Sequence, residues 1–126
     1  MNATAAALKQ YHSVSIRSLV AEASPHRLIQ MLMEGGLSKL AQARGAMERG
    51  QLGLKGELIG HATSIIGGLR EGLDLAQGGE VGSNLDRLYE YMSARLLEAN
   101  MKDSIVMLDE VTGMLREIKG SWDAIA

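Results

Sequence analysis

Three histidines are the residues of this chain best suited to chemistry, and their spacing argues against a metal site. They are His12, His26 and His61. The ferritin-like di-iron bundle uses glutamates three residues before a histidine on the same helix. Here Glu22 and Glu57 come four residues before His26 and His61, and we expect no matching inward acids. We therefore predict no metal site and no other cofactor.

The sequence around His61 suggests a second kind of chemistry. Residues 60–69 read G-H-A-T-S-I-I-G-G-L, and a histidine-phosphotransfer domain is also a four-helix bundle with one exposed histidine. Such a site needs a basic residue about one turn later to hold the phosphoryl group. Ser64 or Ile65 stands there instead. A phosphotransfer signalling bundle is kept as the alternative function.

No other pattern in the chain predicts catalysis. There is no cysteine, which excludes thiol nucleophiles and disulfides. Ser24 lacks a G-x-S-x-G context and precedes Pro25, so it fits a helix cap better than a nucleophile. The pairs Gly35-Gly36 and Gly67-Gly68 lie inside helical patterns rather than in phosphate-binding loops. We predict that the protein is not an enzyme.

The composition narrows the classes of partner. The 126 residues suit one domain, and a net charge of −2 gives no broad electrostatic case for nucleic acid. No apolar run approaches the roughly 20 residues that a membrane-spanning helix needs. The first residues lack the charged start and apolar core of a signal peptide. We expect a soluble protein of the cytosol with no nucleic-acid partner and no membrane insertion.

The strongest helical pattern runs from Asn84 to Asn100. Ser83 and Asp86 match the S-x-x-D signal of a helix start, so we expect this helix to begin there. Its apolar residues recur at steps of three and four, which places them on one helix face. They are Leu85, Leu88, Tyr89, Met92, Leu96 and Ala99.

Three further helices are predicted around it. Ser24-Pro25 starts one that should end near Arg49-Gly50, followed by a loop at 51–56. The next should run from 57 to 77 and stop at Gly78-Gly79. After a turn at 100–102, Asp103 or Ser104 should cap the last helix. The fold predicted for residues 24–126 is an all-α, antiparallel four-helix bundle. Residues 1–23 should form a short N-terminal helix or arm.

Two features of these helices point to close contacts and to surplus apolar surface. Each glycine of Gly35-Gly36 costs about 1 kcal/mol relative to alanine in a helix, so we expect another backbone to approach there.

On the last helix an inward stripe is broadened by Met107 and Met114; its members are Ile105, Leu108, Val111, Leu115, Ile118 and Trp122. Exposed apolar surface of this kind usually marks a partner site, and an amphipathic segment is its usual occupant.

Several separate motifs, in the right order, resemble the family of the flagellar secretion chaperone FliS over nearly the whole chain. They are Tyr11 in the N-terminal arm, A-S-P-H-R-L-I-Q-M-L-M-E-G at 23–35, Q-A-R-G-A-M-E at 42–48, L-D-L-A-Q-G-G-E at 73–80, N-L-D-R-L-Y-E-Y-M at 84–92 and R-L-L-E-A-N at 95–100. One departure is Met33, where the family usually has tyrosine.

The resemblance implies a function. FliS proteins are helical bundles that bind the disordered C-terminal region of flagellin in the cytosol. They prevent premature polymerisation and help deliver flagellin to the export gate of the type III flagellar apparatus. The resemblance also implies that the arm, with Leu8 and Tyr11, takes part in binding and covers the apolar groove when flagellin is absent.

We take nine apolar residues as candidates for flagellin binding. Apolar grooves can also pair with each other or exchange an arm, so a homodimer stays open. The candidates are Leu8, Tyr11, Leu28, Met31, Leu85, Leu88, Tyr89, Met107 and Met114.

Overall fold

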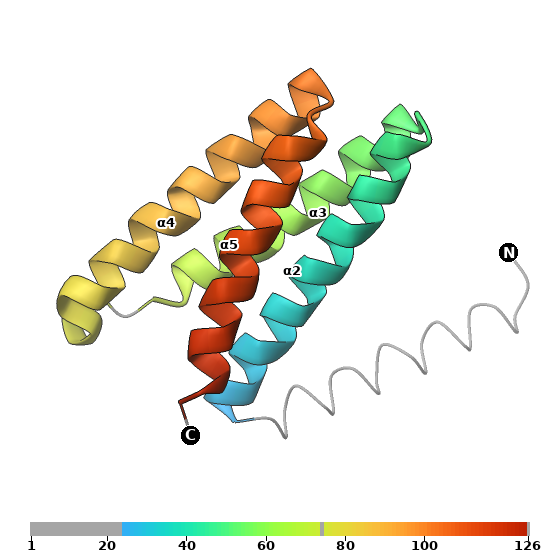
Figure 1. Ribbon diagram of the computed structural model, residues 1–126. Helices are drawn as coiled ribbons and strands as arrows, with labels where there is room; N and C mark the ends of the chain where they lie inside the picture. Colours follow the sequence, from blue (N-terminus) through green and yellow to red (C-terminus); the bar gives the residue numbers. More distant parts are fainter. Residues whose placement is uncertain (1–23, 74, 126) are drawn as a thin grey trace, which may run out of the picture.

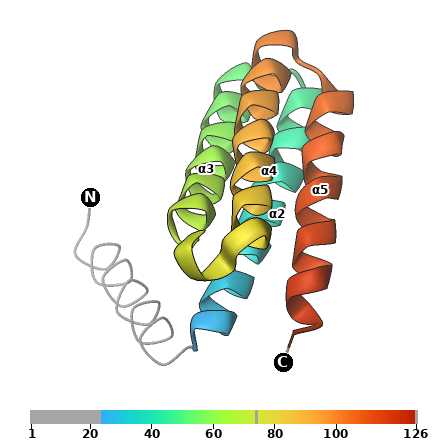
Figure 2. The ribbon, with the colours of Figure 1, turned by 90° about the vertical axis from the view of Figure 1, so that its left-hand side faces the viewer.

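The computed structural model describes residues 24–73 and 75–125, and within them it contains four α-helices. They pack as an antiparallel bundle in which α2 and α4 each lie against both α3 and α5 (Figures 1 and 2). The prediction of an all-α four-helix bundle is confirmed, whereas the predicted arm at 1–23 lies outside the described residues. The helices are α2 (Pro25–Glu48), α3 (Leu52–Glu71), α4 (Leu75–Lys102) and α5 (Ile105–Asp123).

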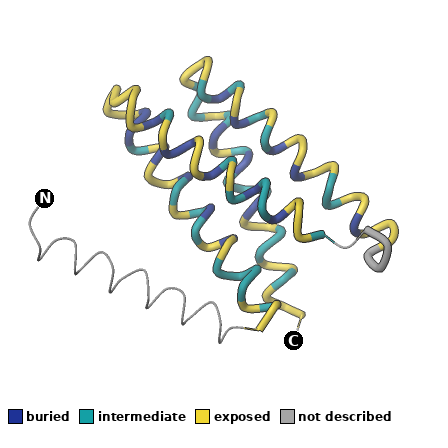
Figure 3. The backbone as a smooth tube through the Cα atoms, turned by 180° about the vertical axis from the view of Figure 1, so that it is seen from behind, coloured by how far each residue is buried: buried dark blue, intermediate teal, exposed yellow. Residues whose placement is uncertain are grey.

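The core is made of aliphatic and methionine side chains from all four helices. Buried positions follow the inner faces of the bundle, and exposed positions follow the outer faces (Figure 3). Tyr89, Met92, Leu96 and Ala99, from the stripe predicted between Asn84 and Asn100, are all buried. The largest fully buried side chains are Met33, Leu40, Ile66, Met92, Leu96, Leu108, Val111 and Leu115.

Helix α2 begins and ends where the sequence predicts. The Ser24 hydroxyl accepts a hydrogen bond from the backbone N–H of Arg27 at 3.1 Å, and Pro25 is the first helical residue. At the other end Gly50 has a φ of 70°, a conformation that glycine adopts without strain. The N–H of Gln51 reaches the carbonyl of Ala46 at 2.9 Å, which completes a Schellman motif.

The prediction of a loop at 51–56 is wrong, because α3 already begins at Leu52. Gly50 reverses the chain by itself, so no longer connection is needed. Lys55, which in sequence looks like a polar loop residue, is only 5% exposed. Its ammonium donates to the carbonyl of Asn100 at 2.9 Å and to the carboxylate of Asp103. These contacts anchor the start of α3 to the turn between α4 and α5.

The predicted boundary between the second and third helices is also wrong. Helix α3 ends at Glu71 rather than at residue 77, with Gly72 as its C-cap, and α4 begins at Leu75. Gly79 lies inside α4 and breaks its helical geometry with φ 55° and ψ −129°. Glycine is suited to this backbone conformation. The interruption predicted at Gly78-Gly79 is therefore present, as a kink at which two helical segments of α4 meet.

The helix start predicted at Ser83 and Asp86 is not found, because both residues lie inside α4. The Asp86 carboxylate accepts a hydrogen bond from Arg70 of α3 at 2.6 Å. Helix α4 runs on through the turn predicted at 100–102. Of the two caps considered for α5, Ser104 is the one observed, since its hydroxyl accepts from the N–H of Met107 at 3.2 Å.

The glycine pair of α2 faces side chains rather than the backbone of another helix, which corrects the expectation above. A Cβ atom on Gly36 would lie 3.1 Å from Cδ2 of Leu115 and 3.4 Å from Cγ2 of Ile65. The same atom on Gly35 would lie 3.7 Å from Cδ1 of Ile65. Gly36 therefore leaves room for α3 and α5 to place branched side chains against α2.

Gly36→Ala should be less stable than Gly60→Ala by about 1–3 kcal/mol. Replacing glycine by alanine in a helix interior stabilises the helix by about 1 kcal/mol, and this gain applies to both variants. At Gly36 the added methyl overpacks against Leu115, which costs roughly 1–3 kcal/mol. At Gly60 the methyl meets nothing within 4 Å in the described part of the chain. Urea denaturation of the two variants measures the difference, and equal stabilisation by both would contradict this packing.

Candidate partner-binding groove

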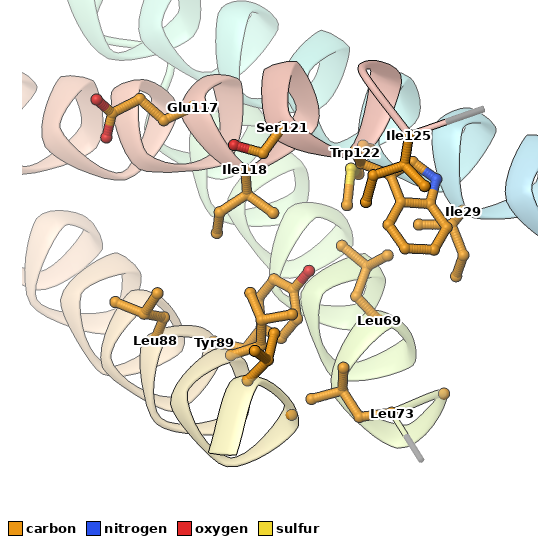
Figure 4. A pocket seen from close by; sticks show the side chains of 15 residues that line it. Ile29, Leu69, Leu73, Leu88, Tyr89, Glu117, Ile118, Ser121, Trp122 and Ile125 are labelled. Atoms are coloured by element: carbon orange, nitrogen blue, oxygen red, sulfur yellow. The ribbon is translucent and has the colours of Figure 1, made fainter. Parts of the chain in front are cut away.

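An apolar groove of about 850 Å³ opens at the end of the bundle where α2 begins and α5 ends (Figure 4). All four helices contribute to it, and its side chains are apolar or aromatic apart from Glu117 and Ser121. The lining residues are Ile29, Met33, Leu69, Gly72, Leu73, Val81, Gly82, Leu85, Leu88, Tyr89, Glu117, Ile118, Ser121, Trp122 and Ile125.

On one side of the groove, polar and aromatic contacts hold the end of α5 against the start of α2. The ring of Trp122 stacks on His26 with a centroid separation of 4.8 Å and an interplanar angle of 15°. The Trp122 Nε1 donates to the carbonyl of His26 at 3.0 Å. Gln30 donates to the Asp123 carboxylate at 2.8 Å, and Lys119 pairs with Asp123 at 2.6 Å. These contacts fix Trp122 at the edge of the groove.

On the other side, ion pairs hold the end of α3 against α4. The Arg70 guanidinium donates to Asp86 at 2.6 Å and to Glu90 at 3.3 Å. The hydrogen bond from Arg70 lowers the pKa of Asp86, so this carboxylate stays ionised at neutral pH. These contacts set the position of the groove residues Leu85 and Tyr89 on α4.

A third set of contacts joins α4 to α5 outside the groove. The Glu110 carboxylate accepts from Nε of Arg95 at 2.6 Å and from the hydroxyl of Tyr91 at 2.8 Å. Both bonds lower the pKa of Glu110, and the bond from Arg95 has the larger effect. The seam between the two helices is therefore closed at Glu110, and the groove lies beyond that point toward the end of α5.

The groove has a buried floor and an exposed rim. Met33, Leu69 and Tyr89 form the floor and are 1–2% exposed, and burial raises the pKa of the Tyr89 phenol. On the rim Val81 is 68% exposed and Leu88 is 40% exposed. Apolar side chains left open to water around a cavity indicate a surface that a partner covers. The arrangement can bind an apolar segment.

The structure brings three of the nine candidate residues together. Leu85, Leu88 and Tyr89 all line the groove. The other candidates lie elsewhere: Leu28 and Met31 are half-buried on α2, Met107 and Met114 are half-buried on α5, and Leu8 and Tyr11 lie outside the described residues.

Several groove residues were not candidates. Leu69 and Leu73 fall within the second predicted helix, and Ile118 and Trp122 belong to the inward stripe of the last one. Their spacing is the same as that of fully buried residues, so periodicity alone does not separate them. The available signal is topological, because these positions all fall at the same end of an antiparallel bundle.

The histidines take no part in a shared site among the described residues. His26 stacks on Trp122, and His61 is exposed on α3 away from the groove lining. His12 lies outside the described residues. Among residues 24–73 and 75–125, no helix has the length and apolar character needed to cross a membrane.

Comparison with known proteins identifies the family. A family described as "Flagellar protein FliS" matches residues 7–126. The flagellar secretion chaperone FliSB of Pseudomonas aeruginosa is 62% identical over 120 residues, covering 95% of each chain. The flagellar secretion chaperone FliS of Salmonella typhimurium is 44% identical over 98% of this chain and 92% of its own. That of Vibrio cholerae is 43% identical over 94% of this chain and 87% of its own. With its bundle and its apolar groove, this chain therefore belongs to the FliS family.

Proposed function

We propose that this protein is a flagellar secretion chaperone whose groove binds the disordered C-terminal segment of flagellin in the cytosol. The observation that carries the proposal is the apolar groove at one end of the bundle, with its exposed rim residues Val81 and Leu88. Membership of the FliS family, whose relatives are named flagellar secretion chaperones, supports the same role.

The groove fits a partner that folds as it binds. A disordered segment loses conformational entropy on ordering, and burial of its apolar side chains must offset that loss. The floor residues Leu69 and Tyr89 offer such burial, and Met33 adds a flexible side chain that adapts to the shape of the partner. While the flagellin segment is held there, it is unavailable for polymerisation. The chaperone then presents flagellin to the export apparatus.

Titration calorimetry with a peptide of the flagellin C-terminal segment tests the proposal. We expect a one-to-one complex and a large negative heat-capacity change, because apolar surface is buried on both partners. A peptide of the same composition in scrambled order is the control. Absence of binding, or equal binding of the scrambled peptide, would contradict the proposal.

We further propose that the arm at 1–23 takes part in the same site. Leu8 and Tyr11 would occupy part of the groove in the free protein and move when flagellin arrives. The same titration with a chain that lacks residues 1–16 tests this, since removal of a competing or contributing arm must change the measured affinity. An unchanged affinity would exclude a role for the arm.

A further inference from the structure

The hydroxyl of Tyr89 is a polar group inside the apolar groove. The side chain of Tyr89 is 2% exposed and belongs to the floor. Its hydroxyl oxygen is directed into the groove, toward the carbon atoms of Ile118 and Leu69 (Figure 4). The other polar side chains of the lining, Glu117 and Ser121, are exposed. Tyr89 therefore places a hydrogen-bonding group in surroundings that are otherwise apolar.

The Tyr89 hydroxyl has no hydrogen-bond partner among the residues that the structure describes. No hydrogen bond between described residues ends on it, and no fully buried polar side-chain atom of those residues is left without a partner. Its direction in Figure 4 places it at the surface of the groove. Tyr91, two residues later, differs because its hydroxyl donates to Glu110 at 2.8 Å.

We propose that the Tyr89 hydroxyl donates a hydrogen bond to a neutral acceptor of the segment that fills the groove, and that this bond fixes the register of the segment. The inference rests on the function proposed above and adds a condition on the partner. The segment must offer an amide oxygen, a hydroxyl or a backbone carbonyl at the centre of its apolar contact surface.

Desolvation is the physical reason for this condition. When the segment enters, it displaces water from the hydroxyl, and a polar group buried without a partner is strongly unfavourable. A site built around a hydrogen-bonding group discriminates sharply against occupants that lack the matching group. Because burial raises the pKa of Tyr89, the phenol stays protonated at neutral pH and acts as a donor. A carboxylate is a poor acceptor here, because the hydroxyl lies among apolar side chains and a buried charge is strongly unfavourable.

Tyr89→Phe tests the inference, with Tyr91→Phe as the matched control. Tyr89→Phe should weaken binding of the flagellin C-terminal peptide about ten-fold in titration calorimetry, because the acceptor of the peptide is left unpaired. Tyr91→Phe should keep the affinity within about two-fold, since its hydroxyl lies outside the groove and pairs with Glu110. The urea midpoint of free Tyr89→Phe should equal or exceed that of the wild type, because no hydrogen bond between described residues is lost.

Three outcomes would overturn the inference. In the first, Tyr89→Phe binds as tightly as the wild type. In the second, both variants lose affinity equally, which would mean that the effect is not specific to the groove. In the third, the urea midpoint of free Tyr89→Phe falls, which would assign the hydroxyl to the fold. Failure of the wild-type protein to bind the peptide is a different result, and it would reject the proposed function itself.

Discussion

Leu88→Asp is expected to weaken binding of the flagellin C-terminal segment at least about thirty-fold. Leu88 lies on the rim of the groove and is 40% exposed in the free protein, and an occupant of the groove would cover this exposed part. Aspartate removes that apolar contact and places a charge where water is displaced, which is strongly unfavourable without a partner. Titration calorimetry with the flagellin peptide measures the loss.

Leu52→Asp is the matched control for this variant. Leu52 is 59% exposed, but it lies at the start of α3, at the opposite end of the bundle from the groove. Both substitutions replace an exposed leucine by aspartate, so both should change the free energy of unfolding by less than about 1 kcal/mol. If Leu52→Asp weakens binding as much as Leu88→Asp, the groove is not the binding surface.

Leu96→Ala is expected to lower the free energy of unfolding by about 3 kcal/mol. Leu96 is fully buried on α4, and its truncation removes apolar contacts and leaves a cavity between tightly packed helices. Leu97→Ala, at the next position of the same helix, should change the free energy of unfolding by less than about 1 kcal/mol, because Leu97 is 60% exposed.

Urea denaturation of the two alanine variants measures this contrast directly. Equal losses at 96 and 97 would mean that α4 turns a different face to the core. The same experiment checks which face of α4 is turned to the core, which the sequence predicts correctly. The start of this helix is not predicted correctly.

The sequence predicted helix faces and strong caps better than helix boundaries. Ser24 and Ser104 act as caps because their hydroxyls meet nearby N–H groups, which is a local property of the chain. Lys55 and Gly79 misled the prediction for the opposite reason. Lys55 is buried by distant contacts at Asn100 and Asp103, and a glycine in a sequence does not reveal whether it ends a helix or bends it.

The groove was only partly accessible to sequence reasoning. Leu85, Leu88 and Tyr89 were found because they belong to the most regular helical stripe of the chain. Ile118 and Trp122 were predicted to lie in the core, because their spacing shows only which face of the helix they share. It does not show that the facing helices lie far enough away to leave a groove there. That separation depends on the packing of all four helices together, which no single stripe encodes.

Polar contacts between helices are distributed unevenly along the bundle. Away from the groove, Lys55 joins α3 to the end of α4, and Glu110 joins α5 to α4. At the groove, a contact at His26 joins α2 to α5, and one at Arg70 joins α3 to α4. Among the described residues, no hydrogen bond or ion pair crosses the groove from the α2–α5 pair to the α3–α4 pair. Each of the two helix pairs is thus held together by its own polar contacts, and these contacts do not depend on what fills the groove. We therefore expect that apolar segments of different width can enter the groove without the loss of any of these contacts.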